Sequence, residues 1–138
     1  MIQPKVPIWI YALQTVLCLI LLEQAVSYWQ MNYWGDFAVT ASQKREILEL
    51  AGRTTAMFLV GVLVMLSQNP HYFVPLFLLN IFRETQETFI DAMYETDTYP
   101  WVNILVHAVI IALEVLALVK VYKISTTHKF HRQCTKED

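Results

Sequence analysis

The sequence predicts an all-α fold, namely a four-helix transmembrane bundle whose helices alternate in direction (up-down-up-down). Of its 138 residues, 56% are hydrophobic and 16% are charged, which is too apolar for an ordinary soluble domain. The apolar residues fall into runs close to the ~20 residues that a helix needs to cross a bilayer. The chain has only 3 glycines and no low-complexity stretch, so we expect one domain without linkers.

The spans follow from these apolar runs and the turn residues between them. Thr40 to Gln43 has the spacing of a capping box, which predicts a helix over 41–68. Asn69 as N-cap and Pro70 at the first helical position predict that the third helix starts there and ends near Met93. We expect a membrane domain over 1–122 and a basic tail over 123–138, with spans at about 6–28, 51–68, 71–93 and 101–122.

Charge distribution predicts the orientation. Four spans would put both termini on the same side of the membrane. Lysines and arginines gather after the last span, and the positive-inside rule therefore favours cytoplasmic termini. The net charge of −2 provides no basic field, so we expect no nucleic-acid partner. Cys18 lies in the first apolar run and Cys134 in the polar tail, so we expect no disulfide between them.

A polar stripe on the third span is the main functional signal. Asn80, Glu84, Glu87 and Asp91 are spaced i, i+4, i+7 and i+11, which places them on one face of a helix. Arg83 lies beside this face and can pair with Glu87 at i+4. Ionisable residues inside a membrane are costly and usually face an interior or a water-filled cavity.

The other spans also carry polar residues at similar depths. Glu23 lies on the first span and Arg53 on the second, while Asn103, His107 and Glu114 share one face of the fourth. Counted from the span midpoints at about 1.5 Å per residue, most of these residues fall in the outer half of the membrane, and Glu114 falls slightly inward. The sequence therefore predicts a shared polar pocket open toward the non-cytoplasmic side.

The chemistry expected of this pocket is acid–base or hydrogen-bonding chemistry. Acids outnumber arginines, and buried carboxylates must pair, take up a proton or stay hydrated. We expect Glu84, Glu87 and His107 to be the catalytic or ligand-contacting groups. The residues expected to bind ligand or balance charge are Glu23, Arg53, Arg83, Asp91, Asn103 and Glu114. The predicted function is to bind or act on a lipophilic small molecule such as a quinone, a sterol or an isoprenoid.

Three alternatives stay open. The charges can form a packing network in an accessory or assembly subunit of a larger membrane complex. They can carry protons or cations, which would require a homodimer because four helices make a thin pathway. Glu84, Glu87 and His107 also have metal-ligand side chains. The Glu-x-x-His pattern of ferritin-like bundles is absent, however, so we expect no metal. No cofactor can be named.

From about residue 51 to residue 121 the chain resembles the DoxX-like group of small four-helix bacterial membrane proteins. The residues that carry the resemblance are Gly52-Arg53, Ala56, Gly61, Arg83, Asp91 and Leu113 to Leu116. The resemblance implies the four-helix architecture, a bacterial inner membrane and an arginine–carboxylate arrangement in the outer half. Members of this group have been tied to quinone-linked oxidoreductase complexes.

Overall fold

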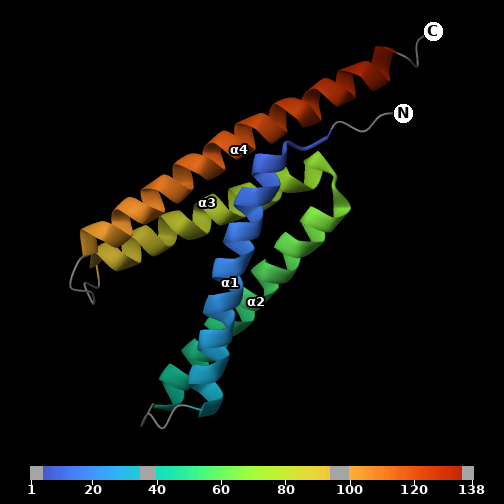
Figure 1. The fold of residues 1–138 in the computed structure, drawn as a ribbon. Coiled ribbons are helices and arrows are strands. Elements are labelled where there is room, and N and C mark those ends of the chain that lie inside the picture. The colour runs from blue at the N-terminus through green and yellow to red at the C-terminus, as the bar shows by residue number, and fades with distance from the viewer. Residues whose placement is uncertain (1–4, 35–39, 94–99, 135–138) are drawn as a thin grey trace. The chain divides into compact units, whose positions relative to one another are not determined.

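The computed structural model describes residues 5–34, 40–93 and 100–134, and the side chains of 32–34, 41, 91–92, 100 and 127–134 lie outside the described part. The chain forms four α-helices: α1 (Ile8–Trp34), α2 (Ala41–Ser67), α3 (Pro70–Met93) and α4 (Pro100–Cys134) (Figure 1). The described residues include no β-strand. The all-α prediction is confirmed.

The two predicted helix starts have the expected caps. The Thr40 backbone N–H donates to Gln43 Oε1 at 2.9 Å, and the Gln43 N–H donates back to Thr40 Oγ1 at 3.4 Å, which is the reciprocal bonding of a capping box. At the start of α3, the His71 N–H donates to Asn69 Oδ1 at 3.1 Å. Asn69 is therefore the N-cap, and Pro70 occupies the position where a missing N–H costs nothing.

Two helices are longer than the sequence predicts. The first helix was expected to end near Tyr28, but α1 continues to Trp34. The last was expected to end near Tyr122, with 123–138 as a polar tail, but α4 continues to Cys134. Neither extension contains a glycine or proline, so nothing in the backbone chemistry stops the helix there. Loss of apolar character predicts where a membrane segment ends, and it does not predict where the helix ends.

The helices pair into two hairpins, α1 with α2 and α3 with α4, and each hairpin belongs to a separate compact unit. In the first hairpin Thr15 reaches Met65, and Trp29 donates to Thr55 Oγ1 at 3.1 Å. Later residues of α1 therefore contact earlier residues of α2, so these two helices are antiparallel. Figure 1 shows the same arrangement for α3 and α4.

The α1–α2 hairpin has a close helix contact at Gly61. A Cβ at this position would lie 2.8 Å from Cys18 Sγ and 3.0 Å from Gln14 Nε2. Cys18 and Gln14 are both buried. Small residues allow membrane helices to approach closely, and Gly61 has this role between α1 and α2.

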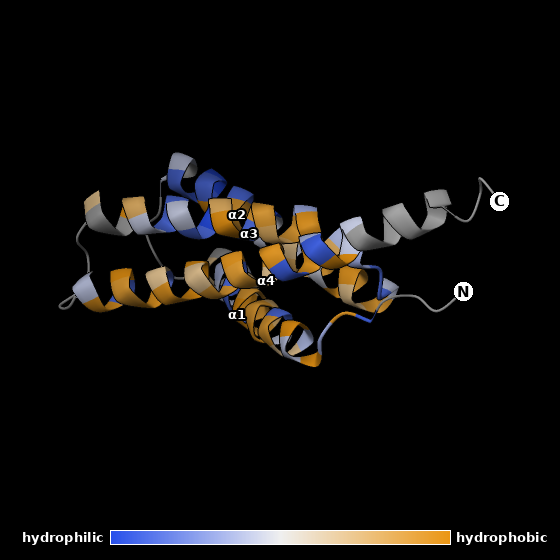
Figure 2. Ribbon diagram, turned by 90° about the horizontal axis from the view of Figure 1, so that it is seen from above, coloured by the Kyte–Doolittle hydropathy of each residue, from blue (hydrophilic) through white to orange (hydrophobic). Residues whose placement is uncertain are grey.

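Within the described residues, three helices are long and apolar enough to cross a membrane: Ile8–Met31 of α1, Ser42–Ser67 of α2 and Trp101–Thr126 of α4. Hydrophobic residues dominate the ribbons, and the first turns of α2 are hydrophilic (Figure 2). α3 is not among the three because its C-terminal half is charged. Since α3 packs along α4, the charged half of α3 is paired with a helix that can cross the bilayer. The fourth span, at 71–93, stays a prediction.

Candidate functional site

The inner face of the α3–α4 hairpin is apolar in one half and polar in the other. On α3 the buried positions include Phe73, Phe77, Asn80 and Glu84, at alternating spacings of four and three residues. On α4 the buried positions Glu114, Ala117 and Val121 repeat the same spacing. Asn80, Glu84 and Glu114 lie toward the connection between α3 and α4, and the apolar members lie away from it. Ser125 is a buried polar residue near the other end, and its hydroxyl donates to the Tyr122 carbonyl at 2.9 Å.

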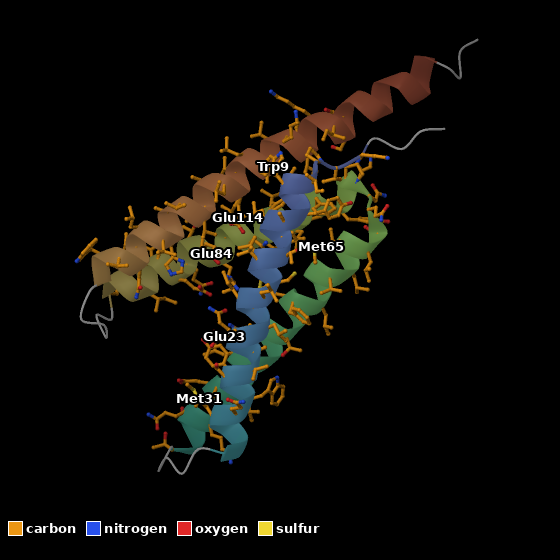
Figure 3. All side chains as sticks on the ribbon, viewed as in Figure 1. Trp9, Glu23, Met31, Met65, Glu84 and Glu114 are labelled. Atoms are coloured by element: carbon orange, nitrogen blue, oxygen red, sulfur yellow. The ribbon has the colours of Figure 1, made fainter. Side chains whose placement is uncertain are left out.

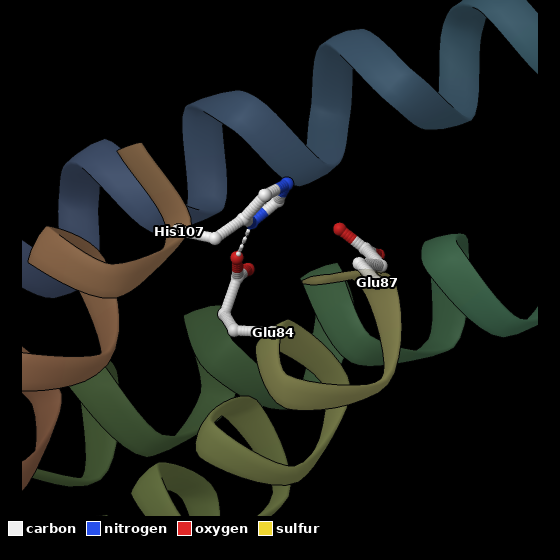
Figure 4. Close-up of side chains that lie close together, drawn as sticks. All are labelled: Glu84, Glu87 and His107. Atoms are coloured by element: carbon white, nitrogen blue, oxygen red, sulfur yellow. Dashed lines mark hydrogen bonds and ion pairs between the residues drawn. The ribbon is translucent and has the colours of Figure 1, made fainter. Parts of the chain in front are cut away.

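Glu84 is the centre of the polar half. It is 1% exposed, and both carboxylate oxygens are engaged. With its proton on Nδ1, His107 of α4 donates to Glu84 Oε2 at 2.6 Å (Figure 4). Arg83 Nη2 donates to Glu84 Oε1. The carboxylate thus joins the two helices, with a cation on one side and an imidazole on the other.

Arg83 extends this cluster to Glu87. Arg83 Nε lies 3.5 Å from Glu87 Oε1, which confirms the predicted i, i+4 pair. The Glu87 side chain is 33% exposed and that of Arg83 is 17% exposed. The cluster therefore contains one partly exposed carboxylate, Glu87, and one buried carboxylate, Glu84. One arginine facing two carboxylates gives the cluster an excess of acidic over basic groups.

Glu84, Glu87 and His107 come together as the sequence predicted. Each offers one metal-ligand atom, and these atoms all lie within 4.8 Å of one another. Two carboxylate oxygens and one imidazole nitrogen are suitable ligands for first-row divalent metals. Arg83 already interacts with both carboxylates, however, so it occupies part of the coordination capacity that a cation would use.

A second polar pair lies further along the same face. Glu114 of α4 is 0% exposed and Asn80 of α3 is 3% exposed. The charges of Glu84 and Arg83 interact electrostatically with the Glu114 carboxyl, and Asn80 is its polar neighbour. Asn80 is a hydrogen-bond donor within reach of the Glu114 carboxyl, although the distance or angle between Asn80 Nδ2 and the Glu114 oxygens does not meet the geometry of a well-formed hydrogen bond. Among the described residues, Asn80 Nδ2 and both Glu114 oxygens have no other hydrogen-bond partner. Figure 3 labels Glu84 and Glu114 on their helices.

The remaining predicted site residues are distributed over both hairpins. Glu23 on α1 accepts a hydrogen bond from Ser27 Oγ at 3.1 Å. Arg53 on α2 lies 3.8 Å from Glu49, with a side chain that is 74% exposed. The Glu23–Arg53 pair that a packing network would use is not formed between these two described side chains. A pocket shared by all four helices, with Glu23 and Arg53 in it, stays a prediction.

Two further predicted residues lie on the α3–α4 hairpin. Asn103 is half-buried on α4, one helical turn before His107, as its spacing predicted. Asp91 lies on α3, and its side chain is outside the described residues. Its predicted role at the outer end of the stripe therefore stays a prediction.

Three buried polar residues were not among the predicted site residues: the amides Asn80 and Gln14, and Ser125, whose hydroxyl bonds to the Tyr122 carbonyl. Asn80 belonged to the predicted stripe, but no role in the site was predicted for its amide. Gln14 is buried in the α1–α2 hairpin, where Nε2 donates to Cys18 Sγ at 3.5 Å and Oε1 has no hydrogen-bond partner among the described residues. The signal for Asn80 and Gln14 was an amide side chain inside an apolar run, which needs a partner when it is buried.

By length and composition the chain is a helical membrane protein, and its α3–α4 hairpin holds a buried arginine–glutamate–histidine cluster. Comparison of the chain with models of protein families, with curated proteins and with solved structures finds no match. The function must therefore be argued from the site itself.

Proposed function

We propose that this membrane protein binds, or acts on, the polar end of a lipophilic small molecule such as a quinone, a sterol or an isoprenoid. The observation that carries the proposal is the buried hydrogen bond between His107 Nδ1 and Glu84 Oε2, 2.6 Å long, on helices whose outer faces are apolar. A partly exposed histidine held by a buried carboxylate is positioned to exchange a proton or a hydrogen bond with a ligand. A ligand that is mostly hydrocarbon can reach such a site from the bilayer.

Glu87 and His107 have the groups that a ligand can contact first. Both side chains are partly exposed, whereas Glu84 behind them is buried. We assign Glu87 and His107 to ligand contact and Glu84 to holding His107 in one orientation. Arg83 balances the charge of the two glutamates and limits the cost of burying them.

Native mass spectrometry of the full chain, purified in a mild detergent, tests this proposal. The wild-type protein should carry a co-purifying lipophilic molecule, which Glu87→Gln and His107→Ala should lose. Glu49→Gln is the matched control because Glu49 forms only exposed ion pairs on α2. Full retention of the bound molecule by both site variants would contradict the proposal.

A divalent cation at Glu84, Glu87 and His107 is the second candidate, and one observation favours it: the three ligand atoms lie within 4.8 Å of one another. Arg83 competes with such a cation for the carboxylates, so Arg83→Gln should bind Mn²⁺ or Zn²⁺ more tightly than wild type does. Calorimetric titration of the wild-type protein and of Arg83→Gln with each metal measures the two affinities. Absence of metal binding in both proteins would exclude a cation site.

We further infer a four-span topology with cytoplasmic termini in a bacterial inner membrane, as the resemblance to DoxX-like proteins implies. The pairing of α3 with α4 supports the fourth span. The 24 residues of α3 are about 36 Å long, which is sufficient for a crossing. The ion pairs that Arg83, Glu84, Glu87 and His107 form with one another lower the cost of placing these charged residues in a membrane.

A further inference from the structure

The side of α3 opposite Glu84 carries a continuous stripe of exposed residues, which we call the outer stripe. Its members follow one another at alternating spacings of three and four residues, as in the seam of a coiled coil. All of them are exposed, and they are Tyr72, Pro75, Leu79, Phe82, Gln86, Phe89 and Met93. Six of the seven have largely hydrocarbon side chains, so the outer stripe is suited to contact with lipid or with another membrane helix.

Gln86 is the one polar member of the outer stripe. It lies between Phe82 and Phe89, which are 71% and 65% exposed. If α3 crosses the bilayer, as the four-span topology requires, Gln86 is about 7 Å from the middle of the helix and thus inside the ~30 Å hydrocarbon layer. Lipid chains can neither donate nor accept a hydrogen bond, so an amide that faces them is costly. The position of Gln86 therefore indicates a polar partner on this face.

A second copy of the chain supplies that partner by symmetry. Two copies in one membrane have the same orientation, so a two-fold axis along the membrane normal places each α3 parallel to its mate, with identical residues at the same level. An amide has an acceptor oxygen and a donor NH₂ group, so Gln86 can donate to and accept from Gln86 of the other copy. A single polar residue in an apolar seam also fixes the register of the two helices.

The residues around Gln86 are compatible with such pairing. Phe82 and Phe89 would meet their own copies across the axis, and aromatic pairs of this kind stabilise helix contacts. The nearby charges do not oppose it, because Arg83 Nε lies 3.5 Å from Glu87 Oε1 and the two charges balance each other. Glu84 is on the opposite side of α3 and is bonded to His107, so pairing through the outer stripe leaves that bond in place.

We propose that the outer stripe of α3 is a homodimer interface held in register by Gln86. The inference goes beyond ligand binding, and it rests on the four-span topology. Another protein would need a polar group placed by chance at the level of Gln86, whereas a second copy has one there by symmetry. Interhelical hydrogen bonds of glutamine are a known source of association between membrane helices.

Energy transfer between donor-labelled and acceptor-labelled full-length chains in lipid vesicles measures the dimer at a series of protein-to-lipid ratios. Gln86→Leu should raise the dissociation constant about 3- to 30-fold, which corresponds to about 0.6–2 kcal/mol for hydrogen bonds between membrane helices. Gln86→Asn keeps an amide and should stay closer to wild type than Gln86→Leu. Gln30→Leu is the matched control, because it removes an exposed glutamine from α1, and it should leave the dimer unchanged.

Cysteine crosslinking in native membranes tests the geometry, in a chain whose own two cysteines are replaced by alanine. Phe89→Cys should form a disulfide-linked dimer on oxidation, since a disulfide needs Cβ atoms about 4 Å apart. Leu116→Cys, on an exposed position of α4, should not. A wild-type monomer at every protein-to-lipid ratio, or a dimer that Gln86→Leu leaves unchanged, would overturn the proposal. Reporter fusions at the termini test the four-span topology separately, so a failed dimer can be told apart from a failed topology.

Discussion

At the scale of single residues, Glu84 determines whether the α3–α4 hairpin can hold its charges. Both of its oxygens are used, one by Arg83 and one by His107, and the residue is 1% exposed. Exposed pairs such as Arg45–Glu49 have the same residue types at 3.1 Å but remain in water. Burial makes the difference, because removing one partner of a buried pair leaves the other charge uncompensated.

We therefore expect Glu84→Gln to lower the free energy of unfolding by about 3 kcal/mol, since it leaves His107 without its carboxylate and Arg83 with Glu87 as its remaining ion pair. Unfolding by SDS titration in mixed micelles measures the change. Glu49→Gln, which removes an exposed carboxylate, should stay within about 0.5 kcal/mol of wild type. Similar values for the two variants would mean that the Glu84 cluster is hydrated as fully as the surface pair.

Gln68 is a second residue whose local backbone conformation affects stability. It lies between α2 and α3 with φ of 52°, in the left-handed region that side chains other than glycine adopt at a cost. Gln68→Gly should unfold with a free energy about 1 kcal/mol higher than Gln68→Ala, because only glycine is free of strain at this φ. Thermal unfolding of the two variants in the same detergent tests the difference. An alanine variant as stable as the glycine variant would contradict the strain.

At the scale of the elements, the α1–α2 hairpin depends on one close approach. Gly61 has no room for a side chain, since Cys18 Sγ would lie 2.8 Å from an added Cβ. Gly52 lies on the same helix, and a Cβ there meets nothing within 4 Å. The two glycines are thus a matched pair that differ only in whether another helix is in contact.

Gly61→Ala should lower the free energy of unfolding by about 1–3 kcal/mol, the usual cost of overpacking. Gly52→Ala should be neutral or stabilising by up to about 1 kcal/mol, because alanine is the better helix former. Adding Cys18→Ala to the Gly61 variant should restore part of the loss by removing the sulfur. SDS titration of the three variants gives these values, and equal stability of the two single variants would show that the helices separate without cost.

At the scale of the whole molecule, the number of membrane crossings decides how the site is approached. Three helices have the length and apolarity to cross, and α3 is the helix on which the topology depends. With four crossings both termini share one side, whereas with three they lie on opposite sides. The charged residues of α3 make it uncertain from hydropathy alone whether this helix crosses the membrane. Their ion-pair partners on α3 and α4 lower the free-energy cost of a crossing.

Reporter fusions at the two termini distinguish the two topologies. We expect green fluorescent protein to be fluorescent, and alkaline phosphatase inactive, at both ends in a bacterial host, as four crossings with cytoplasmic termini require. A terminus with active phosphatase opposite one with fluorescent protein would mean that α3 does not cross. In that case the Glu84 cluster would lie on the membrane surface, and the ligand would not have to be lipophilic.

The sequence by itself determined the helical class, the starts of α2 and α3, and the grouping of polar residues on α3. Caps and periodicity are local, so Thr40, Asn69 and the Asn80 stripe could be read directly. The ends of α1 and α4 were missed because hydropathy marks the membrane and not the helix. Only the tertiary structure decided that Glu84 is shared between Arg83 and His107 while Asn80 is the neighbour of the buried Glu114 carboxyl. Partner choice depends on how two helices pack face to face, and spacing along one helix carries no information about that.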